Sequence, residues 1–438
     1  MSIEWITLLF FGSAFGLFVI GCPISFSLMI VSILFGTLLW GPSHLYMVAS
    51  SLFGATTPQI LIAVPLFILM GNVLATTGIA RDLFKALHYW SGPLRGGMAV
   101  GTEIICAIFA SMCGTSTAAT ITMGTIALPS MREHGYDKGL SIGSVASGGL
   151  LGLLIPPSVL AVIYASVSGV SVGKLYLGIF IPGFLLLFLY ILYIQVRALL
   201  QPDWAPSLPK AERPSWAEKF KSLKGVALPL VIVLTILGGI YTGTFTPTEA
   251  AGVGALCVIL AAAVTGSLTR ANLIESLLST MRLTCMVLWL IMGVTVFTNV
   301  YNALGAPDII NHLVELLPVT GFGVIVIMQL SIFVLGMIMD DVALILLCTP
   351  IYMPIVVSLG FDPLWFGVLF MVNMQLAWLT PPYGFNLFYM RAITPPDITM
   401  ADIYRAVIPF IGLQLVCLAL VMIFPSLATW LPDLIIGH

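Results

Sequence analysis

The sequence predicts an all-α protein that crosses a membrane many times, built from two inverted repeats with two re-entrant hairpins and two interrupted helices. Composition, an internal repeat and the placement of basic residues support this prediction. The 438 residues are 60% hydrophobic and only 8% charged, whereas soluble domains are roughly 25% charged. The mean hydropathy is +1.12, and many apolar runs approach the ~20 residues that span a bilayer. No basic stretch is interleaved with aromatic residues, which argues against nucleic-acid binding.

A repeat with an offset of 225 residues relates the two sides of a polar, proline-rich linker at 201–224. GYDKGLSIGSVASGGLLGLLIPPSVLAVIYA (135–165) aligns without gaps on GFDPLWFGVLFMVNMQLAWLTPPYGFNLFYM (360–390). The offset pairs Pro156–Pro157 with Pro381–Pro382, and GTST (114–117) with MDDV (339–342). We therefore expect a first repeat over 1–200 and a second over 225–438.

The first repeat is expected to begin with scaffold helices within residues 1–80, at about 3–21, 24–41 and 58–77. If the N-terminus is periplasmic, the basic residues that follow at 81, 85 and 95 are cytoplasmic, as the positive-inside rule requires. Residues 96–131 are too short for two full spans and carry GTST in the middle, which predicts a hairpin that enters from the cytoplasm and returns. A helix over 139–168 then crosses outward, and 175–197 returns to the linker.

The second repeat is expected to be inverted. Its scaffold helices lie within 225–301 (225–243, 248–268 and 282–301), followed by a hairpin over 321–358, an interrupted helix over 363–390 and a final helix over 403–430. REHGYDKG after the first hairpin contains two basic residues, whereas its counterpart VVSLGFDP contains none. In this topology 15 of the 16 basic residues are cytoplasmic, only Lys174 is outside, and both termini are periplasmic.

The double prolines lie inside helices that otherwise span the membrane. Proline removes a backbone donor and clashes with the preceding turn, so Pro156–Pro157 and Pro381–Pro382 should each interrupt their helix. Exposed backbone at membrane depth is tolerated only beside protein or a water-filled cavity. Inverted repeats with interrupted helices at matching positions are typical of secondary transporters whose site lies at the midplane.

The hairpin tips and the interrupted helices supply polar groups for such a site. Helix C-termini and unwound turns present carbonyl oxygens to a cation such as Na⁺, and helix N-termini suit a substrate carboxylate. The candidate groups are, at the first tip, Ser111, Gly114, Thr115, Ser116 and Thr117; at the second tip, Asp340 and Asp341; and in the interrupted helices Gly148, Gly149, Ser158, Asn373, Gln375, Thr380 and Asn386.

The paired aspartates interrupt an apolar tract, GMIMDDVALILLCTP (336–350). An ionised carboxylate in hydrocarbon costs several kcal/mol, so we place both at the second hairpin tip. One is expected to face a cation and the other to cap the returning helix; the sequence leaves open which does which. Thr246, Pro247 and Glu249 predict a capping box, and Glu103 either bonds between helices or lines a water path.

Two other functions fit parts of the pattern. A stand-alone Na⁺- or H⁺-coupled organic-anion symporter uses the same physical features without a binding protein. An intramembrane aspartyl protease needs two facing carboxylates, but neighbours on a helix diverge by about 100°, so Asp340 and Asp341 form a poor dyad. The chain is therefore expected not to be an enzyme.

FTPTEAAG (245–252), the GTST hairpin, LIPPSVLAVIYA, and DDVALILLCTP with LTPPYGFNLF together resemble the large membrane subunit of tripartite ATP-independent periplasmic (TRAP) transporters. The resemblance covers essentially the whole chain. It implies an elevator-type, ion-transporter-like fold in the bacterial inner membrane, and Na⁺-driven symport of an organic anion such as a C4-dicarboxylate. It also implies a small four-helix membrane subunit and a periplasmic substrate-binding protein as partners, with Na⁺ as coupling ion and no other cofactor.

The resemblance also implies where the ligands bind. Sodium is expected at Ser111–Ser116 with Gly148–Gly152, and at Gly336–Asp341 with Gln375–Thr380. The sodium set comprises Ser111, Gly114, Thr115, Ser116, Gly148, Gly152, Gly336, Asp340, Asp341, Gln375 and Thr380. The substrate is expected to contact Thr115, Ser116, Thr117, Pro156, Pro157, Pro381, Pro382 and Asn386. Because MSIEW is preceded by no four-helix extension, we expect the small subunit to be a separate polypeptide.

Overall fold

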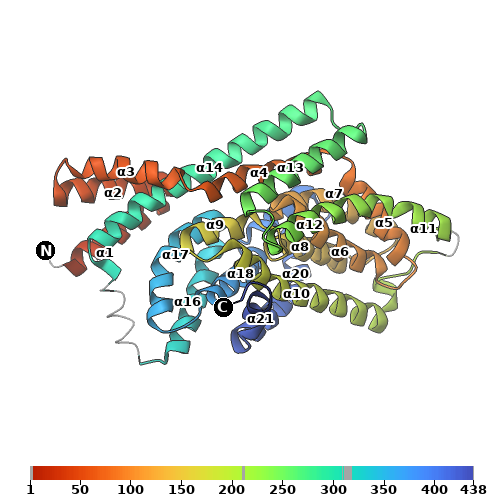
Figure 1. The fold of residues 1–438 in the computed structure, drawn as a ribbon. Helices are drawn as coiled ribbons and strands as arrows, with labels where there is room; N and C mark the ends of the chain where they lie inside the picture. The colour runs from red at the N-terminus through yellow and green to blue at the C-terminus, as the bar shows by residue number, and fades with distance from the viewer. Residues whose placement is uncertain (1–2, 210–212, 308, 310–317, 438) are drawn as a thin grey trace.

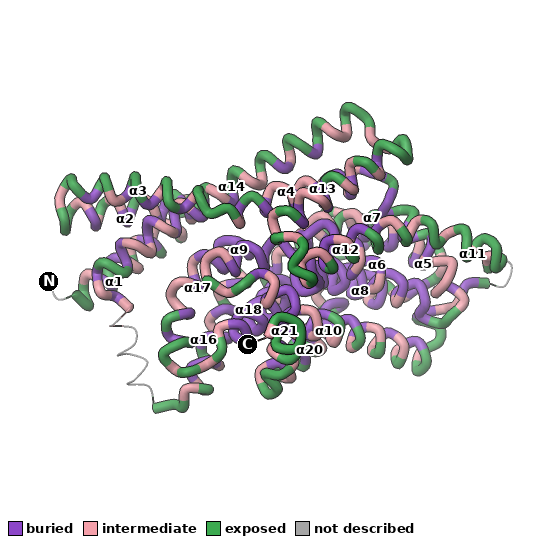
Figure 2. The backbone as a smooth tube through the Cα atoms, in the orientation of Figure 1, coloured by how far each residue is buried: buried purple, intermediate pink, exposed green. Residues whose placement is uncertain are grey.

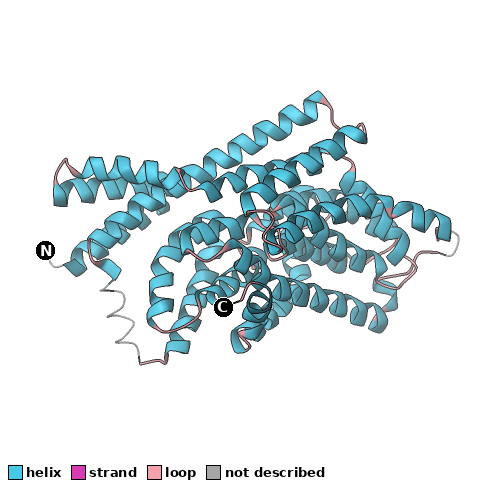
Figure 3. Ribbon diagram, in the orientation of Figure 1, coloured by secondary structure: helices cyan, strands magenta, loops and turns pink. Residues whose placement is uncertain are grey.

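All regular secondary structure in the described part of the chain is helical (Figure 3). The computed structural model describes residues 3–209, 213–307, 309 and 318–437. Eight of the described helical segments are long and apolar enough to cross a bilayer: Gln59–Thr76, Val172–Leu200, Trp216–Tyr241, Pro247–Val264, Arg270–Ala303, Gly321–Ile338, Asp341–Ser358 and Met400–Ile423. The expected class, an all-α polytopic membrane protein, is confirmed.

The first half contains ten α-helices among the described residues. They are α1 (Ile3–Val19), α2 (Ile24–Trp40), α3 (His44–Thr56), α4 (Ala63–Thr76), α5 (Ile79–Ser91), α6 (Gly97–Cys113), α7 (Ser116–Glu133), α8 (Lys138–Leu150), α9 (Val159–Ser168) and α10 (Val172–Leu200). Short 3₁₀ turns, η1 (Gln59–Ile62), η2 (Leu151–Leu153) and η3 (Pro202–Trp204), precede α4 and follow α8 and α10.

The second half begins with the short helix α11 (Trp216–Ser222) within the linker, of which residues 210–212 lie outside the described part of the chain. The further helices are α12 (Lys224–Tyr241), α13 (Pro247–Val264), α14 (Arg270–Ala303), α16 (Gly321–Ile338), α17 (Asp341–Ser358), α18 (Pro363–Leu379), α19 (Phe385–Ile393), α20 (Met400–Ile423) and α21 (Ser426–Ile435).

Two helix pairs joined by sharp turns and two interrupted helices occupy the ranges in which the sequence places the hairpins and the broken helices. The hairpins are α6–α7 and α16–α17, and the interrupted helices are α8–α9 and α18–α19, each broken around its double proline. α6 packs on α8 as α16 packs on α18, and α7 packs on α19 as α17 packs on α9. Each contact thus has a counterpart related by the 225-residue offset, and each hairpin touches the interrupted helices of both halves.

The turns before the interrupted helices also match in their local geometry. Gly135 and Gly360 have φ angles of +74° and +75°, a backbone conformation that glycine adopts without steric cost. Two residues later, Asp137 accepts a hydrogen bond from the Leu140 backbone N–H at 3.0 Å, and Asp362 accepts one from that of Leu364 at 2.7 Å. The aspartates cap α8 and α18, so the repeat read from the sequence marks real helix starts.

Several helix boundaries differ from those expected. α3 and α5 lie in stretches where no helix was expected, and α14 begins at residue 270, although 282 was expected. The first part of α14 is too polar to be recognised from hydropathy. Its start is stabilised by Thr269, whose side chain accepts a hydrogen bond from the Asn272 backbone N–H at 3.1 Å. The final helix, expected as one unit over 403–430, is divided into α20 and α21 at Pro425, because proline disrupts a continuing helix.

The most buried helices lie at the centre of the molecule, and the periphery is exposed (Figure 2). Many of the exposed side chains are large and hydrophobic. Residues 140–150 of α8 and 364–379 of α18 are buried throughout. Outer side chains such as Leu38 and Val264 are 75% and 88% exposed, as expected for helices surrounded by lipid. Helices α1, α2 and α3 extend to one side, and the long α14 connects them to the rest (Figure 1).

Candidate functional site

The first hairpin tip is a sharp glycine turn between α6 and α7. Gly114 has φ +63° and donates its N–H to the Ala110 carbonyl at 2.9 Å, which ends α6. Thr115 is extended and directly precedes α7, and Ser116 is buried. Ser111 donates its hydroxyl to the Ile108 carbonyl at 2.8 Å. Two helix ends therefore meet within a few residues, with the C-terminal carbonyls of α6 beside the N-terminal N–H groups of α7.

At the second tip, the two aspartates make different contacts. The Asp340 carboxylate accepts hydrogen bonds from the backbone N–H groups of Val342 at 3.0 Å and Ala343 at 3.4 Å, and so caps α17. The Asp341 carboxylate accepts one from Val342 at 2.9 Å, and Asp341 is buried. The helix N-terminus stabilises negative charge at both positions. The capping role, which the sequence left open, belongs to Asp340.

Helix α19 packs against α7 of the first hairpin. Its Tyr389 lies near Thr117 at the first tip and in the electrostatic field of Asp340 and Asp341 at the second. Gly114 lies against Val159 at the start of α9, where an added Cβ atom would come within 2.6 Å of its side chain. The second segments of both interrupted helices, α9 and α19, therefore lie against the first hairpin.

The carbonyl oxygens of α8 near its break accept hydrogen bonds from the other half of the chain. Asn386 donates its side-chain amide to the Ala146 carbonyl at 2.7 Å, and its own oxygen accepts from Thr120 at 2.7 Å. Gln375 donates to the Leu150 carbonyl, and its Oε1 atom is buried without a donor. Carbonyl and amide oxygens are the hard ligands that group 1 and 2 cations take in proteins, so this buried oxygen suits a cation.

Small residues allow the hairpins to touch the interrupted helices. A Cβ atom at Gly149 would lie 2.0 Å from Thr120 Oγ1, one at Gly152 would lie 2.7 Å from the Ala110 carbonyl oxygen, and one at Gly336 would lie 2.8 Å from Ala377 Cβ. A larger side chain at Gly152 would therefore displace the backbone of α6, and one at Gly149 or Gly336 would clash with a side chain of the facing helix. These glycines are therefore needed for close helix packing, independently of any cation that their carbonyl oxygens bind.

The turn in α18–α19 is less enclosed than the one in α8–α9. Thr380 donates its hydroxyl to the Leu376 carbonyl at 2.6 Å, and the Pro382 carbonyl accepts from the Tyr404 hydroxyl at 2.8 Å. Pro381 is half-buried and Pro382 is exposed, whereas all residues from 151 to 160 are buried. The site is thus open on the side of Pro382 and closed on the side of Pro156–Pro157.

Sequence reasoning missed some of the residues that shape the site. Thr120, Tyr389 and Tyr404 contact predicted site residues, but they were not among the candidates. Thr120 carries a detectable signal, because it lies one helical turn after Ser116 and shares its face. Tyr404 has none, since its contact with Pro382 depends on how α20 folds back. The amide group of Asn373 donates to the Gln329 carbonyl at 2.6 Å, while its side-chain oxygen is buried without a donor, as that of Gln375 is. The Ser158 side chain caps α9.

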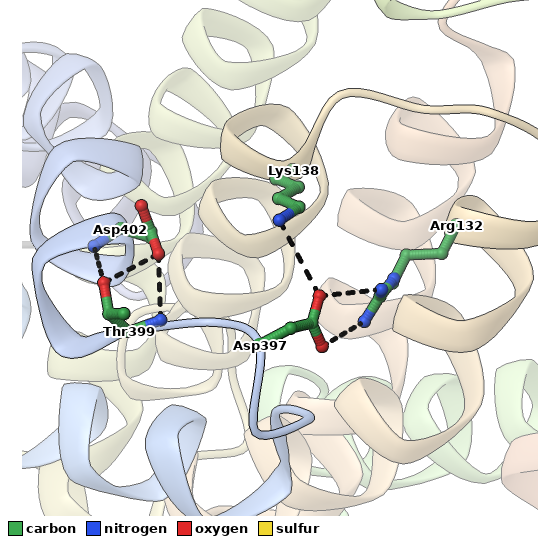
Figure 4. Close-up of polar contacts among 5 residues, drawn as sticks. All are labelled: Arg132, Lys138, Asp397, Thr399 and Asp402. Atoms are coloured by element: carbon green, nitrogen blue, oxygen red, sulfur yellow. Dashed lines mark hydrogen bonds and ion pairs between the residues drawn. The ribbon is translucent and has the colours of Figure 1, made fainter.

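An exposed cluster of ion pairs lies at the end of α7 and the start of α8. Arg132 at the end of α7 donates two hydrogen bonds to Asp397, at 3.2 and 2.9 Å, and Lys138 lies 3.7 Å from the same carboxylate (Figure 4). The hydrogen bonds from Arg132 lower the pKa of Asp397. Arg282 is exposed on α14. Within the described residues, no cluster of His, Cys, Asp and Glu is arranged to hold a metal ion.

The predicted capping box at the start of α13 is confirmed. Thr246 accepts a hydrogen bond from the Glu249 backbone N–H at 3.2 Å, while the Glu249 carboxylate accepts one from the Thr246 N–H at 2.8 Å. With Pro247 as the first helical residue, the motif has a structural role.

Comparison with known proteins agrees with this arrangement. A family described as "Tripartite ATP-independent periplasmic transporter, DctM component" matches residues 11–427. A C4-dicarboxylate TRAP transporter large permease protein of Vibrio cholerae is 32% identical, with 96% of each chain covered. A sialic acid TRAP transporter large permease protein of Vibrio cholerae is 32% identical, covering 98% of this chain and 99% of the other. An ectoine TRAP transporter large permease protein of Halomonas elongata is 30% identical, covering 96% and 97%.

Solved structures share the fold. The YdaH transporter of Alcanivorax borkumensis superposes with a TM-score of 0.64 at 14% identity and covers 96% of this chain and 98% of its own. MtrF of Neisseria gonorrhoeae superposes with a TM-score of 0.61 at 13% identity, covering 88% and 85%. The relatives are transporter components and not enzymes, which confirms the expectation that this chain is no enzyme. The family match over nearly the whole chain and the paired hairpins and interrupted helices show that this multi-pass membrane protein belongs to the DctM family, the large permease components of TRAP transporters.

Proposed function

We propose that this chain transports an organic anion, in symport with Na⁺, after a periplasmic binding protein delivers the substrate. A small four-helix membrane subunit completes the complex in the bacterial inner membrane. The observation that carries the proposal is the meeting of two helix-end tips with two interrupted helices, where carbonyl oxygens and helix N-termini lie side by side. Carbonyl oxygens suit Na⁺, and helix N-termini suit the anion.

The names of related permeases favour a substrate with an acidic group. The related permeases are named for C4-dicarboxylate, sialic acid, ectoine and isethionate, all of which carry a carboxylate or sulfonate group. The tips of this chain offer no basic side chain for such a group. We therefore assign its recognition to the N-termini of α7, α9 and α19 and to hydroxyls such as Thr115 and Thr117, with bound Na⁺ supplying positive charge. The N-terminus of α17 is already occupied by the carboxylates of Asp340 and Asp341.

The proposed sodium ligands are those of the hairpin tips and the breaks. Ser111–Ser116 with Gly148–Gly152 form one proposed site, and Gly336–Asp341 with Gln375–Thr380 form the other. The buried, unpartnered Oε1 of Gln375 and the buried carboxylate of Asp341 support the second assignment.

We further propose an elevator mechanism in which each of the two inverted repeats contributes one segment to the moving unit. The hairpins and interrupted helices (96–168 and 321–390) move together, and the remaining helices form the scaffold. Pro382 is exposed and accepts a hydrogen bond from Tyr404. This exposure supports a conformation in which the proposed site is open toward the edge of the molecule that bears Arg132 and Lys138. That edge is the cytoplasmic face in the topology that places the most basic residues inside.

Uptake into liposomes tests the proposal. The chain is reconstituted with its small subunit, and a labelled dicarboxylate bound to its binding protein is added outside. Uptake should require an inward Na⁺ gradient and should disappear when K⁺ replaces Na⁺. Equal uptake with either cation would contradict Na⁺ coupling. Equal uptake of free substrate without binding protein would instead favour the stand-alone symporter.

A further inference from the structure

The short linker helix α11 has an exposed aromatic surface that the proposed transport chemistry does not use. α11 lies at one end of the molecule beside α5 (Figure 1), and the two helices pack together. The Trp90 indole N–H donates to the Lys219 carbonyl at 3.1 Å, which fixes α11 to the end of α5. The ring centroids of Trp216 and Phe220 lie 6.3 and 5.8 Å from that of Trp90. Both rings nevertheless remain 69% and 61% exposed.

This aromatic surface continues the exposed apolar face of α12. Trp216, Phe220 and Leu223 are spaced as neighbours on one helix face, and the exposed Leu230 extends the same face along α12. Residues Trp216–Tyr241 form 26 consecutive residues of a candidate span, about 39 Å at 1.5 Å per residue. The hydrocarbon core of a bilayer is only about 30 Å thick. One end of this segment therefore reaches the headgroup layer.

The positions of the lysines identify that end as α11. Lys221 and Lys224 are exposed, and Lys219 is half-buried with its Nζ atom 4.9 Å from the centroid of the Trp216 ring. Lys221 and Lys224 line a surface depression of about 390 Å³ together with Lys85 of α5. An ammonium group is costly in hydrocarbon, so these four lysines lie at the depth of the lipid headgroups.

Two carboxylates border the same depression without neutralising the lysines. They are Asp82 on α5 and Glu218 on α11, so the four lysines leave a net charge of +2. The Glu218 carboxylate accepts hydrogen bonds from the backbone N–H and the hydroxyl of Ser215, both at 2.8 Å, and thus serves the capping box of α11. In the described part of the chain, the ion pairs involve Asp397 and none of these lysines.

We propose that Lys85, Lys219, Lys221 and Lys224, together with the aromatic surface of α11, bind the headgroup of an anionic phospholipid. Aromatic rings at the membrane boundary and lysines beside them are the groups that anchor proteins in an anionic leaflet. In the topology that places the most basic residues inside, this is the cytoplasmic leaflet. Because α5 packs on α6 as well as on α11, the bound lipid anchors the chain directly beside the first hairpin.

Titration with defined lipids tests the proposal. The complex with its small subunit, in neutral detergent and without substrate, receives phosphatidylglycerol or phosphatidylcholine with the same acyl chains. Phosphatidylglycerol should raise the melting temperature in a saturable way, and phosphatidylcholine should not. The double variant Lys221→Gln and Lys224→Gln should need about 30-fold more phosphatidylglycerol, since each lysine near an anionic surface contributes roughly fivefold.

The matched control removes the same charge elsewhere. Arg270→Gln with Arg282→Gln, at exposed positions of α14, should keep the parent response. Equal responses of the two double variants, or of the parent to the two lipids, would overturn the proposal. The titration contains neither substrate nor a Na⁺ gradient, so its outcome is independent of the proposed transport function.

Fluorescence quenching gives a second readout that locates the lipid. The contribution of Trp216 is the difference between the spectra of the parent and of Trp216→Phe. Brominated phosphatidylglycerol should quench this contribution more strongly than brominated phosphatidylcholine, and high salt should reduce the excess. Equal quenching by both lipids would mean an apolar contact without headgroup recognition. Absence of quenching by either lipid would mean that protein, such as the small subunit, covers α11; both results contradict the proposal.

Discussion

The two adjacent aspartates at the second hairpin tip, Asp340 and Asp341, have different environments. Asp340 accepts two backbone N–H groups at the start of α17. Asp341 is the more deeply buried, and its carboxylate accepts one N–H group. A cap is replaceable by any residue with a suitable side-chain oxygen, whereas a cation ligand depends on charge. The two residues should therefore respond differently to the same substitution.

The first prediction uses this difference. Asp340→Asn should leave stability and the Na⁺ dependence of uptake almost unchanged, and Asp340→Ala should cost about 1 kcal/mol of unfolding free energy. Asp341→Asn should raise the Na⁺ concentration required for half-maximal uptake, because a proposed ligand loses its charge. Thermal melts and uptake at graded Na⁺ concentrations measure these effects. If Asp341→Asn keeps the parent Na⁺ dependence, the proposed site is built from uncharged oxygens.

At the scale of elements, each helix of the first hairpin ends against a segment that is distant in the sequence. The end of α7 is tied to the turn after α19 by Arg132, Lys138 and Asp397 (Figure 4). The end of α6 lies against α4, where an added Cβ atom at Gly71 would come within 2.4 Å of the Cys113 carbonyl oxygen. In the first contact Arg132 and Lys138 belong to the proposed moving unit and Asp397 lies just after its second segment. The second contact lies between that unit and the scaffold.

The second prediction concerns acid. The hydrogen bonds from Arg132 lower the pKa of Asp397, so its contribution to stability is complete above the unfolded value of about 3.9. It is lost as the pH falls through the lower folded value, where the carboxylate takes up a proton. The melting temperature of the parent should fall more steeply below about pH 4 than that of Asp397→Asn. High salt should reduce the difference, because the pair is exposed. Parallel curves would show that the ion pair adds no stability.

The third prediction concerns movement between α6 and α4. The Cys113 thiol lies 3.8 Å from the Gly71 carbonyl oxygen, and Ile68 and Ala75 share the face of Gly71 on α4. A cysteine at either position, with Cys113 as the remaining native cysteine, should form a disulfide on oxidation and stop uptake. Reduction should restore it, and the Cys113 background without the second cysteine is the control. Full uptake after complete cross-linking would contradict the elevator proposal.

At the scale of the whole molecule, the buried centre contains polar contacts between the two halves. Asn386 and Gln375 in the second half bond to carbonyl oxygens of α8 in the first. The proposed anion site formed around them contains helix N-termini and hydroxyl groups, and such groups recognise a carboxylate or sulfonate without reading the rest of the ligand. Selectivity among organic anions should then reside mainly in the binding protein.

The fourth prediction follows from this division of roles. With a non-cognate binding protein that still docks, the permease should transport the ligand that the protein delivers. Uptake of several labelled organic anions, each with its own binding protein, measures this. The control is the cognate pair assayed in the same liposomes. Rejection of ligands that a docked protein releases would show that the membrane site is itself selective.

The sequence by itself determined the elements whose cause is local. Proline pairs interrupt α8–α9 and α18–α19, and glycine and aspartate form the turns at 135–137 and 360–362. These features depend on backbone sterics and on caps within a few residues, so a repeat in the sequence carries them into both halves. Hydropathy located most of the spans for the same reason, since bilayer thickness sets their length.

The tertiary structure alone decided which groups face one another. The bonds from Thr120 to Asn386, from Gln375 to Leu150 and between Glu103 and Ser147 join residues far apart in the chain. Hydropathy could not assign these contacts, because a polar side chain within a span has several possible partners until the helices pack. It also missed α3 and the first part of α14, whose stability comes from packing and capping. The sequence thus names the polar residues of the site, and packing determines which of their atoms remain free to bind a ligand.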